Sequence, residues 1–321
     1  MPFEYGPISD IEAQLKLTLD IRDIAAITGK TDKGPVDWMA ARGVYESGGN
    51  SKRGDGSTRT LVSVANNPKV LAQFPKGEQL FGAPKFLDAH VQAALTGSGH
   101  SQGLSAPARR QLLDKGILAI LYGEILEELD AAMEKVKIGN VDAAKGAPHN
   151  VDEAWAYYAG AKEGNARPYA LASTAGKRER NFKIEGKLDE PLQRSLSTAL
   201  MASQAGQAKA FDEARTQTRG YLNAIFYLAS LRYVGNLKDD TTAADREVHL
   251  AEAWGFFQTI RPAVAAAAPD AASAVQAVYS KSASQSFTTS DVHTVYQALN
   301  NSKVLQALNI PPGLTFQAPV A

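Results

Sequence analysis

The chain of 321 residues contains no cysteine. This absence excludes disulfide bonds, thiolate nucleophiles, iron–sulfur clusters and zinc sites built on cysteine. A metal ion can therefore be bound only through oxygen or imidazole ligands. The sequence also lacks an apolar run long enough to cross a bilayer, and its first residues lack the features of a secretory signal. We expect a soluble protein, either cytosolic or in the mature form of a secreted protein.

An excess of charge of either sign is also missing, because the 34 Lys and Arg residues balance the 34 Asp and Glu residues. No basic stripe with interleaved aromatic residues is present, so nucleic acid and anionic membranes are not expected partners. Segments that alternate between apolar and polar residues are also too short for a sheet. Abundant alanine and few runs of β-branched residues favour helices instead.

Apolar spacing and capping residues place the helices. The expected helices cover residues 10–27, 35–47, 107–137, 150–160, 188–215, 216–234, 242–260 and 290–299. Residues 9–12 and 150–153 read as capping boxes that begin two of them, and residues 48–60 read as a loop. The fold class is therefore an all-α multi-helix bundle, either one domain over residues 1–321 or two helical halves, 1–165 and 166–321.

All three tryptophans lie in a short pattern with helical spacing of aromatic and small residues. Trp38 and Trp155 are each followed by a glycine five positions later and a glutamate eight positions later, which are Gly43 and Gly160, and Glu46 and Glu163. The third copy, at Trp254, keeps only the aromatic residues. The pattern suggests duplication of a helical unit. By itself it indicates core packing and no chemistry.

Several carboxylates fall on apolar faces of the expected helices. At about 100° per residue, Glu128 falls inside the apolar arc of helix 107–137 and Glu124 on its edge, whereas Glu127 points further out. Glu247 lies on the face of Trp254 in a later helix. Burying a carboxylate is unfavourable unless it is paired with a cation or bound to a metal.

Two explanations of these carboxylates remain open at this stage. One is internal ion pairing, with Arg178 and Arg180 as partners, and the other is a metal site. Glu153 is the weaker ligand candidate because its expected position in a capping box already explains it, whereas Asp152 is the stronger one. The candidate metal ligands are Glu46, Glu124, Glu128, Asp152 and Glu247.

Two other functional patterns are present. The loop 48–60 could bind an anion through its backbone N–H groups, and Arg59, Arg178 and Arg180 are the candidate residues for binding an anion or for contacting the metal ligands. Residues 99–103 match the G-x-S-x-G motif of hydrolases, with Ser101 at its centre. That motif functions only where a strand runs into a helix, and here a helical pattern precedes it. We therefore expect Ser101 to have no catalytic role.

Three segments together resemble a known family. They are residues 149–160, the loop 49–61 and residues 177–182, and they are similar to the low-iron-inducible periplasmic proteins of algae, also described as iron-assimilating or high-CO2-inducible. The resemblance implies a secreted protein that helps to capture iron at the cell surface. It also implies Glu-x-x-Glu pairs as iron ligands, which here would be Glu124 and Glu127, whereas the helical wheel favours Glu124 with Glu128.

The resemblance thus implies a periplasmic or extracellular protein, and we expect it to have no catalytic activity. It would bind iron, Fe3+ or Fe2+, through oxygen ligands and deliver it to a plasma-membrane iron transporter. The first alternative is a binding protein that responds to an anion such as bicarbonate. The second is a hydrolase that uses Ser101.

Overall fold

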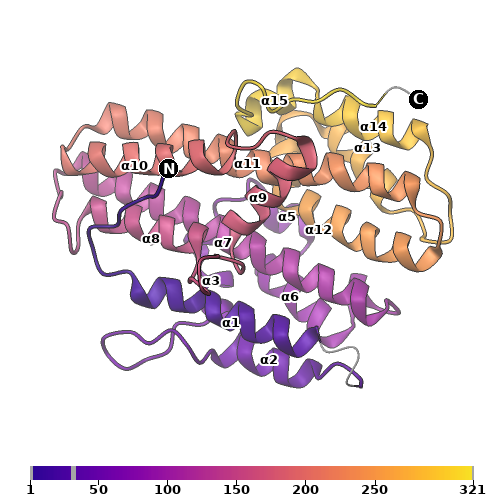
Figure 1. Cartoon of the computed structure of the whole chain (residues 1–321), viewed down its shortest axis with the longest axis horizontal. Helices are drawn as coiled ribbons and strands as arrows, with labels where there is room; N and C mark the ends of the chain where they lie inside the picture. The colour runs from indigo at the N-terminus through magenta and orange to yellow at the C-terminus, as the bar shows by residue number, and fades with distance from the viewer. Residues whose placement is uncertain (1–2, 30–33, 320–321) are drawn as a thin grey trace. The chain divides into compact units, whose positions relative to one another are not determined.

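The computed structural model describes residues 3–29 and 34–319, and it is built from helices (Figure 1). Within these residues no β-strand is formed. Two isolated bridges of strand type are present, Lys52 with Thr58 and Glu163 with Ala166. The all-α fold expected from the sequence is therefore confirmed, and residues 48–60 lie outside helices as predicted.

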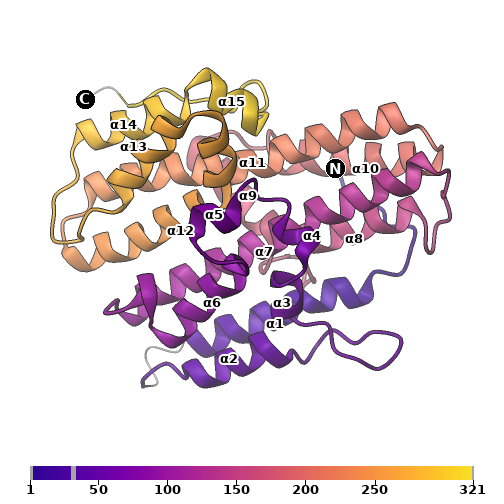
Figure 2. The ribbon, with the colours of Figure 1, turned by 180° about the vertical axis from the view of Figure 1, so that it is seen from behind.

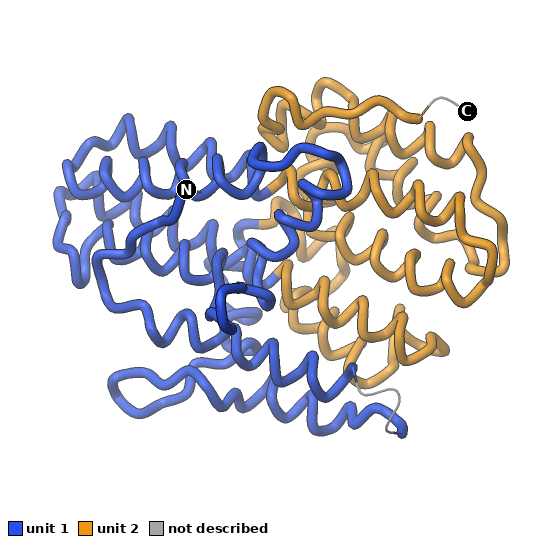
Figure 3. Tube along the Cα trace, in the orientation of Figure 1, with its two compact units in different colours: residues 1–73, 120–222 blue, residues 74–119, 223–321 orange. Residues whose placement is uncertain are grey.

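Contacts divide the chain into two compact units, each made of two segments (Figure 3). The first unit joins the residues up to 73 with residues 120–222, and the second joins residues 74–119 with those from 223 onward. The long helices α7 (Ala106–Lys137) and α11 (Ala208–Asp239) each contribute residues to both units. The division into halves at residue 165 stays a prediction.

Helices α1, α8, α9 and α10 form the packed body of the first unit. Besides parts of α7 and α11, this unit contains α1 (Glu12–Thr28), α2 (Trp38–Ser47), α3 (Leu61–Ala65), α4 (Pro68–Leu71), α8 (Ala147–Ala159), α9 (Leu171–Phe182) and α10 (Asp189–Gln204). The short helices α3 and α4 are both labelled in Figure 2. As predicted, α1 ends at Gly29, whose N–H is bonded to the carbonyl of Ala25.

The second unit contains a chain of packed helices near the C-terminus, in which α12 contacts α13 and α15, and α13 contacts α14. Its elements, besides parts of α7 and α11, are α5 (Gly77–Phe81), α6 (Phe86–Thr96), the 3-10 helix η2 (Gly99–Ser101), α12 (Ala243–Ala267), α13 (Pro269–Tyr279), α14 (Thr289–Leu299) and α15 (Ser302–Leu308). Among the described helices of both units, none is long and apolar enough to span a membrane.

Helix α8 is the central element of the first unit. It packs against α1, α9 and α10, and every residue from Asn150 to Ala159 is buried. A helix covered on all sides directs its polar side chains into the interior along with its apolar ones. Asn150, Asp152 and Glu153 are therefore all buried.

Both expected capping boxes are wrong. Helix α8 begins at Ala147, with Pro148 in its first turn, so residues 150–153 lie inside the helix and cap nothing. Helix α1 begins after Ile11, and no side chain caps it. The hydroxyl of Ser9 donates instead to Asp152, 143 residues later. A long-range contact has replaced the local one in this case.

The boundary expected between residues 215 and 216 also lies elsewhere. Helix α10 ends before Gly206, which has a φ of 65°, and α11 then runs without a break from Ala208. Phe211 and Leu222 continue one buried face through the expected boundary. Arg215, at the expected boundary, is half-buried and pairs with Asp130 at 2.5 Å.

The two glycines of the tryptophan pattern have different environments. Gly160 ends α8 with a φ of 71°, and a Cβ atom there would lie 2.8 Å from the Cβ of Ala170. Gly43 lies inside α2, and a Cβ atom there would meet nothing within 4 Å. Only Gly160 is therefore required by the backbone and by its neighbours.

This contrast predicts opposite effects of the same substitution. Gly160→Ala should lower the free energy of unfolding by about 1–3 kcal/mol, because it combines an unfavourable φ with a close contact. Gly43→Ala should raise it by about 0.5–1 kcal/mol, because alanine is the better helix former. Urea unfolding followed by circular dichroism measures both, and equal effects of the two changes would contradict the assignment.

Candidate functional site

The first unit buries three glutamates in one region. Glu124 and Glu128 lie one turn apart on α7, and Glu153 lies on α8. Their residues are only 6%, 6% and 8% exposed. The inward direction predicted for Glu124 and Glu128 is thus confirmed. Glu127 is less buried, and its carboxylate lies 3.6 Å from the ammonium of the exposed Lys69.

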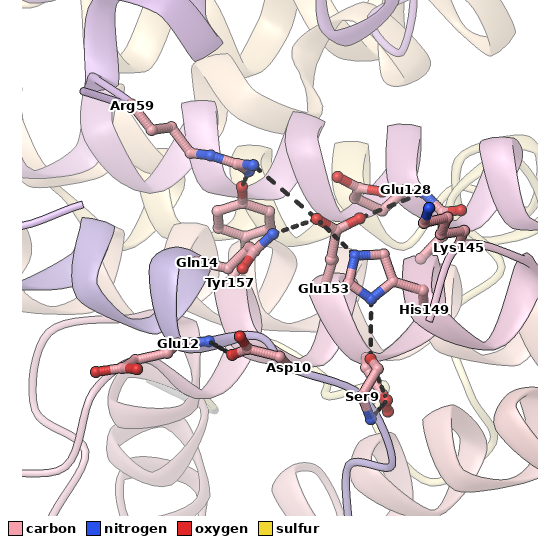
Figure 4. Close-up of polar contacts among 12 residues, drawn as sticks. Ser9, Asp10, Glu12, Gln14, Arg59, Glu128, Lys145, His149, Glu153 and Tyr157 are labelled. Carbon is pink, nitrogen blue, oxygen red and sulfur yellow. Dashed lines mark hydrogen bonds and ion pairs between the residues drawn. The ribbon is translucent and has the colours of Figure 1, made fainter. Parts of the chain in front are cut away.

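The buried carboxylates are contacted mainly by amide groups (Figure 4). The side chain of Asn150 donates to Oε2 of Glu128 at 2.5 Å and to Oε2 of Glu153 at 3.4 Å. The side chain of Gln14 donates to Oε1 of Glu153. Amides satisfy the hydrogen-bonding capacity of a carboxylate without neutralising its charge.

One guanidinium approaches the group. Nη2 of Arg59 lies 4.0 Å from Oε1 of Glu153, and Nη1 of the same side chain donates to the hydroxyl of Tyr157. A hydrogen bond from Tyr157 and the charge of Arg59 both act to lower the pKa of Glu124. Of the three arginines named from the sequence, Arg59 is thus placed at the glutamates.

Burial nevertheless dominates the ionisation of these groups. It raises the pKa of Glu124 from 4.5 to about 7, and the charge of Glu127 adds to the rise. Burial also raises the pKa of Glu128 well above its usual value, and the neighbouring charges of Glu153 and Glu124 raise it further. In addition, Oε2 of Glu124 is buried without a hydrogen-bond partner. The charge of Arg59 therefore does not offset the burial of three carboxyl groups, and one buried oxygen lacks a donor.

His149 borders the same group, and sequence analysis missed it together with Glu153. Both lie on α8, one turn apart, and Nε2 of His149 is 3.6 Å from Oε1 of Glu153. The false capping box removed Glu153 from consideration. An i, i+4 pair of His and Glu on one helix is the signal that could have identified both.

Asp152 holds the N-terminal segment. It accepts hydrogen bonds from the hydroxyl of Tyr5, from the backbone N–H groups of Ile8 and Ser9, and from the hydroxyl of Ser9, all between 2.7 and 2.9 Å. A metal ion bound to Asp152 would have to displace some of these donors. The segment of residues 5–9 is thus fixed against α8 by one carboxylate.

The remaining candidates have partners of their own. Glu46 pairs with Arg42 at 2.8 Å on α2. Glu247, in the second unit, accepts a hydrogen bond of 3.3 Å from the N–H of Ser105. On α9, Arg178 is buried and Arg180 is exposed. Their roles as ligands or anion-binding residues stay predictions.

Across residues 3–29 and 34–319, no group of three or more His, Asp or Glu side chains is already arranged to hold a metal ion. The three glutamates and His149 therefore form a cluster whose side chains would have to move to converge on one ion. Here, "the glutamate cluster" denotes Glu124, Glu128 and Glu153. It shares Glu124 and Glu128 with the predicted ligand set, lacks Glu46, Asp152 and Glu247, and includes Glu153.

Ser101 does not have the setting of a catalytic serine. It ends the 3-10 helix that follows α6, and no strand precedes it in the described part of the chain. Its side chain is fully buried, and the hydroxyl has no hydrogen-bond partner. A nucleophile elbow exposes its serine on a sharp turn between a strand and a helix.

Ser101→Ala should therefore leave every activity unchanged. Because the buried hydroxyl has no partner, its removal should keep the free energy of unfolding level or raise it by about 1 kcal/mol. An esterase screen and a thermal melt of both proteins check this. If the wild type hydrolyses an ester and Ser101→Ala does not, the hydrolase hypothesis is supported again.

The raised pKa values make stability depend on pH. Between the unfolded and folded pKa of Glu124, the folded state binds more protons, so stability falls as pH rises through this range. A shift from 4.5 to about 7 corresponds to a loss of about 3 kcal/mol between about pH 5 and pH 8. Glu128 acts in the same direction.

The double variant Glu124→Gln, Glu128→Gln should show a markedly weaker decline in stability over this pH range. Urea unfolding of the metal-free proteins at several pH values measures the difference. Titrating groups that do not interact with these two glutamates are common to both proteins and cancel in the comparison. Parallel pH profiles would mean that these two glutamates ionise normally.

Comparison with known proteins adds independent information. Residues 4–297 match the family described as low iron-inducible periplasmic protein. No curated protein and no solved structure matched the chain. The match covers nearly the whole chain and both compact units, and it confirms the resemblance seen in the sequence. The chain belongs to the low iron-inducible periplasmic protein family.

Proposed function

We propose that this protein binds iron at the glutamate cluster and assists iron assimilation without catalysing a reaction. The observation that carries the proposal is the burial of three glutamates around amide donors, with one oxygen of Glu124 left without any partner. Burying several carboxylates without enough positive charge is unfavourable for the empty protein. A bound cation would supply the missing charge.

The chemistry of the cluster fits iron. Carboxylate oxygens are hard ligands that both Fe3+ and Fe2+ accept, and a chain without cysteine offers no thiolate. In the metal-free protein, protons occupy part of the cluster because burial raises the pKa of Glu124 and Glu128. Binding would exchange these protons for the metal ion, as in other metal sites.

Binding would require side chains to rotate, because no ligand set is preformed. Glu128 and Glu153 are held by the side-chain amides of Asn150 and Gln14, and such bonds can be exchanged for bonds to a metal. Oε2 of Glu124 has no bond to lose. The cluster can thus converge by rotation of side chains on α7 and α8, without refolding of either helix.

Family membership supports the biological setting. The family is described as periplasmic and induced by low iron. A protein produced under iron limitation in that compartment is suited to capturing scarce iron and delivering it to a plasma-membrane transporter. Iron is the cargo in this proposal.

Glutamine substitution tests the site directly. The double variant Glu124→Gln, Glu128→Gln should bind Fe2+ under anaerobic conditions, and ferric citrate in air, at least about 100-fold more weakly than the wild type. The reason is that losing groups that merely support metal ligands already weakens binding 10–100-fold. Metal content after dialysis and calorimetric titration measure the change.

Two single variants on the same helix serve as controls. Glu134→Gln changes an exposed carboxylate paired with Lys137, and it should bind iron as the wild type does. Glu127→Gln tests whether Glu127, rather than Glu128, is the partner of Glu124 as an iron ligand, because Glu127 pairs with Lys69 outside the cluster. Unchanged iron binding in the double variant would remove Glu124 and Glu128 from the site.

A thermal melt of the metal-free double variant decides between metal binding and internal ion pairing. If the cluster is an empty metal site, stability should stay level or rise, because uncompensated charge has been removed. If the glutamates neutralise Arg178 or another buried cation, stability should drop by about 3–5 kcal/mol. A drop together with unchanged iron binding would contradict the proposal.

A further inference from the structure

The N-terminal segment contacts the glutamate cluster through His149 (Figure 4). Oγ of Ser9 lies 3.0 Å from Nδ1 of His149, and Nε2 of the same ring lies 3.6 Å from Oε1 of Glu153. The imidazole therefore lies between a hydroxyl on one side and a buried carboxylate on the other. Which nitrogen carries the proton decides what the ring can do.

The hydrogen bonds around Ser9 settle that question. Its hydroxyl has a single proton, which it donates to Oδ2 of Asp152 at 2.8 Å. The other three partners of Asp152 are also donors, so this carboxylate acts only as an acceptor. Oγ of Ser9 must then accept from Nδ1–H of His149. In a neutral imidazole this leaves the lone pair on Nε2, on the side of Glu153.

We propose that His149 is a nitrogen ligand of the iron site, positioned by Ser9 and Asp152, and that it makes the site selective for Fe2+ over Ca2+ and Mg2+. This inference rests on the proposed iron-binding function. A ligating histidine usually donates its second N–H to a neighbouring acceptor, which fixes the ring and its tautomer. Ser9 is that acceptor here, and Asp152 fixes the orientation of Ser9.

The distances support convergence on one ion. Two donors bound at about 2.1 Å to the same metal, at angles near 90–110°, lie about 3.0–3.4 Å apart. The separation of 3.6 Å between Nε2 of His149 and Oε1 of Glu153 is close to this range. A small rotation of either side chain would complete the pair. Both residues lie on one rigid helix, which limits other relative movement.

The nitrogen ligand accounts for the selectivity. Carboxylates alone serve Ca2+ and Mg2+ as well as iron, whereas imidazole favours iron and other transition metals. The glutamate cluster would supply negative charge for any cation, and His149 would distinguish among cations. Selectivity would then depend on the N-terminal segment, because Ser9 belongs to it.

Three variants separate ligand, positioning and background effects. His149→Gln removes the nitrogen ligand. Ser9→Ala removes the acceptor of Nδ1–H together with one hydrogen bond to Asp152, while the backbone N–H groups of Ile8 and Ser9 still bind Asp152. His293→Gln, at an exposed histidine of α14, is the matched control. Circular dichroism establishes that each variant folds.

Anaerobic titration with Fe2+, and titration with Ca2+ and Mg2+, measures the selectivity. His149→Gln should weaken Fe2+ binding by at least about 10–100-fold and leave Ca2+ and Mg2+ binding within about twofold, so that the preference for iron collapses. Ser9→Ala should shift Fe2+ binding in the same direction by a smaller factor. His293→Gln should bind all three ions as the wild type does.

Nitrogen-15 correlation spectra of the metal-free protein show which ring nitrogen of His149 carries the proton. A purely structural role of Ser9 would not change this tautomer. In the wild type, the His149 ring should show the pattern of a proton on Nδ1, and Ser9→Ala should shift it toward a mixture of tautomers. A proton on Nε2 in the wild type, or unchanged Fe2+ selectivity in His149→Gln, would overturn the inference while the glutamate cluster keeps its role. Absence of iron binding in the wild type would instead overturn the proposed function and this inference together.

Discussion

Burial of polar side chains along helix α8, from Asn150 to Ala159, is the constraint on which the first unit depends. Helix α8 is packed by α1, α9 and α10, so each polar group on it needs a partner inside the protein. Asp152 finds its partners in the N-terminal segment, and Asn150 finds them in Glu128 and Glu153. The same packing that stabilises the helix thus brings residues from distant parts of the sequence to one place.

Asp152 and Glu153 are neighbours on α8, and their different hydrogen-bond partners give them different roles. Asp152 receives four hydrogen bonds from donors, and its charge is well solvated by the protein. Glu153 receives amide hydrogen bonds, and its charge raises the pKa of the buried Glu128. Adjacent carboxylates on one helix can therefore serve as a structural anchor and as part of a charged cluster. The difference comes from the direction in which each side chain leaves the helix.

Local periodicity was enough to predict much of this structure. The wheel of the long helix correctly directed Glu124 and Glu128 inward, because a helix of 32 residues provides many apolar positions to define its buried face. The start of α8 was misplaced by three residues, because the pattern at 150–153 matches a capping box. His149 and Glu153 were lost with it. The contact of Ser9 with Asp152 spans 143 residues, and no local pattern can indicate such a pairing.

The fluorescence of Trp155 can report the position of the N-terminal segment. Its ring stacks on Tyr5 with the centroids 5.0 Å apart, and the guanidinium of Arg167 lies 4.8 Å from its centroid. Tyr5 also binds Asp152, so movement of the segment would change the surroundings of the indole directly. Trp38 and Trp254 belong to other helices and serve as internal references. With those two replaced by phenylalanine, indole emission becomes an optical signal for attachment of residues 5–9 to α8.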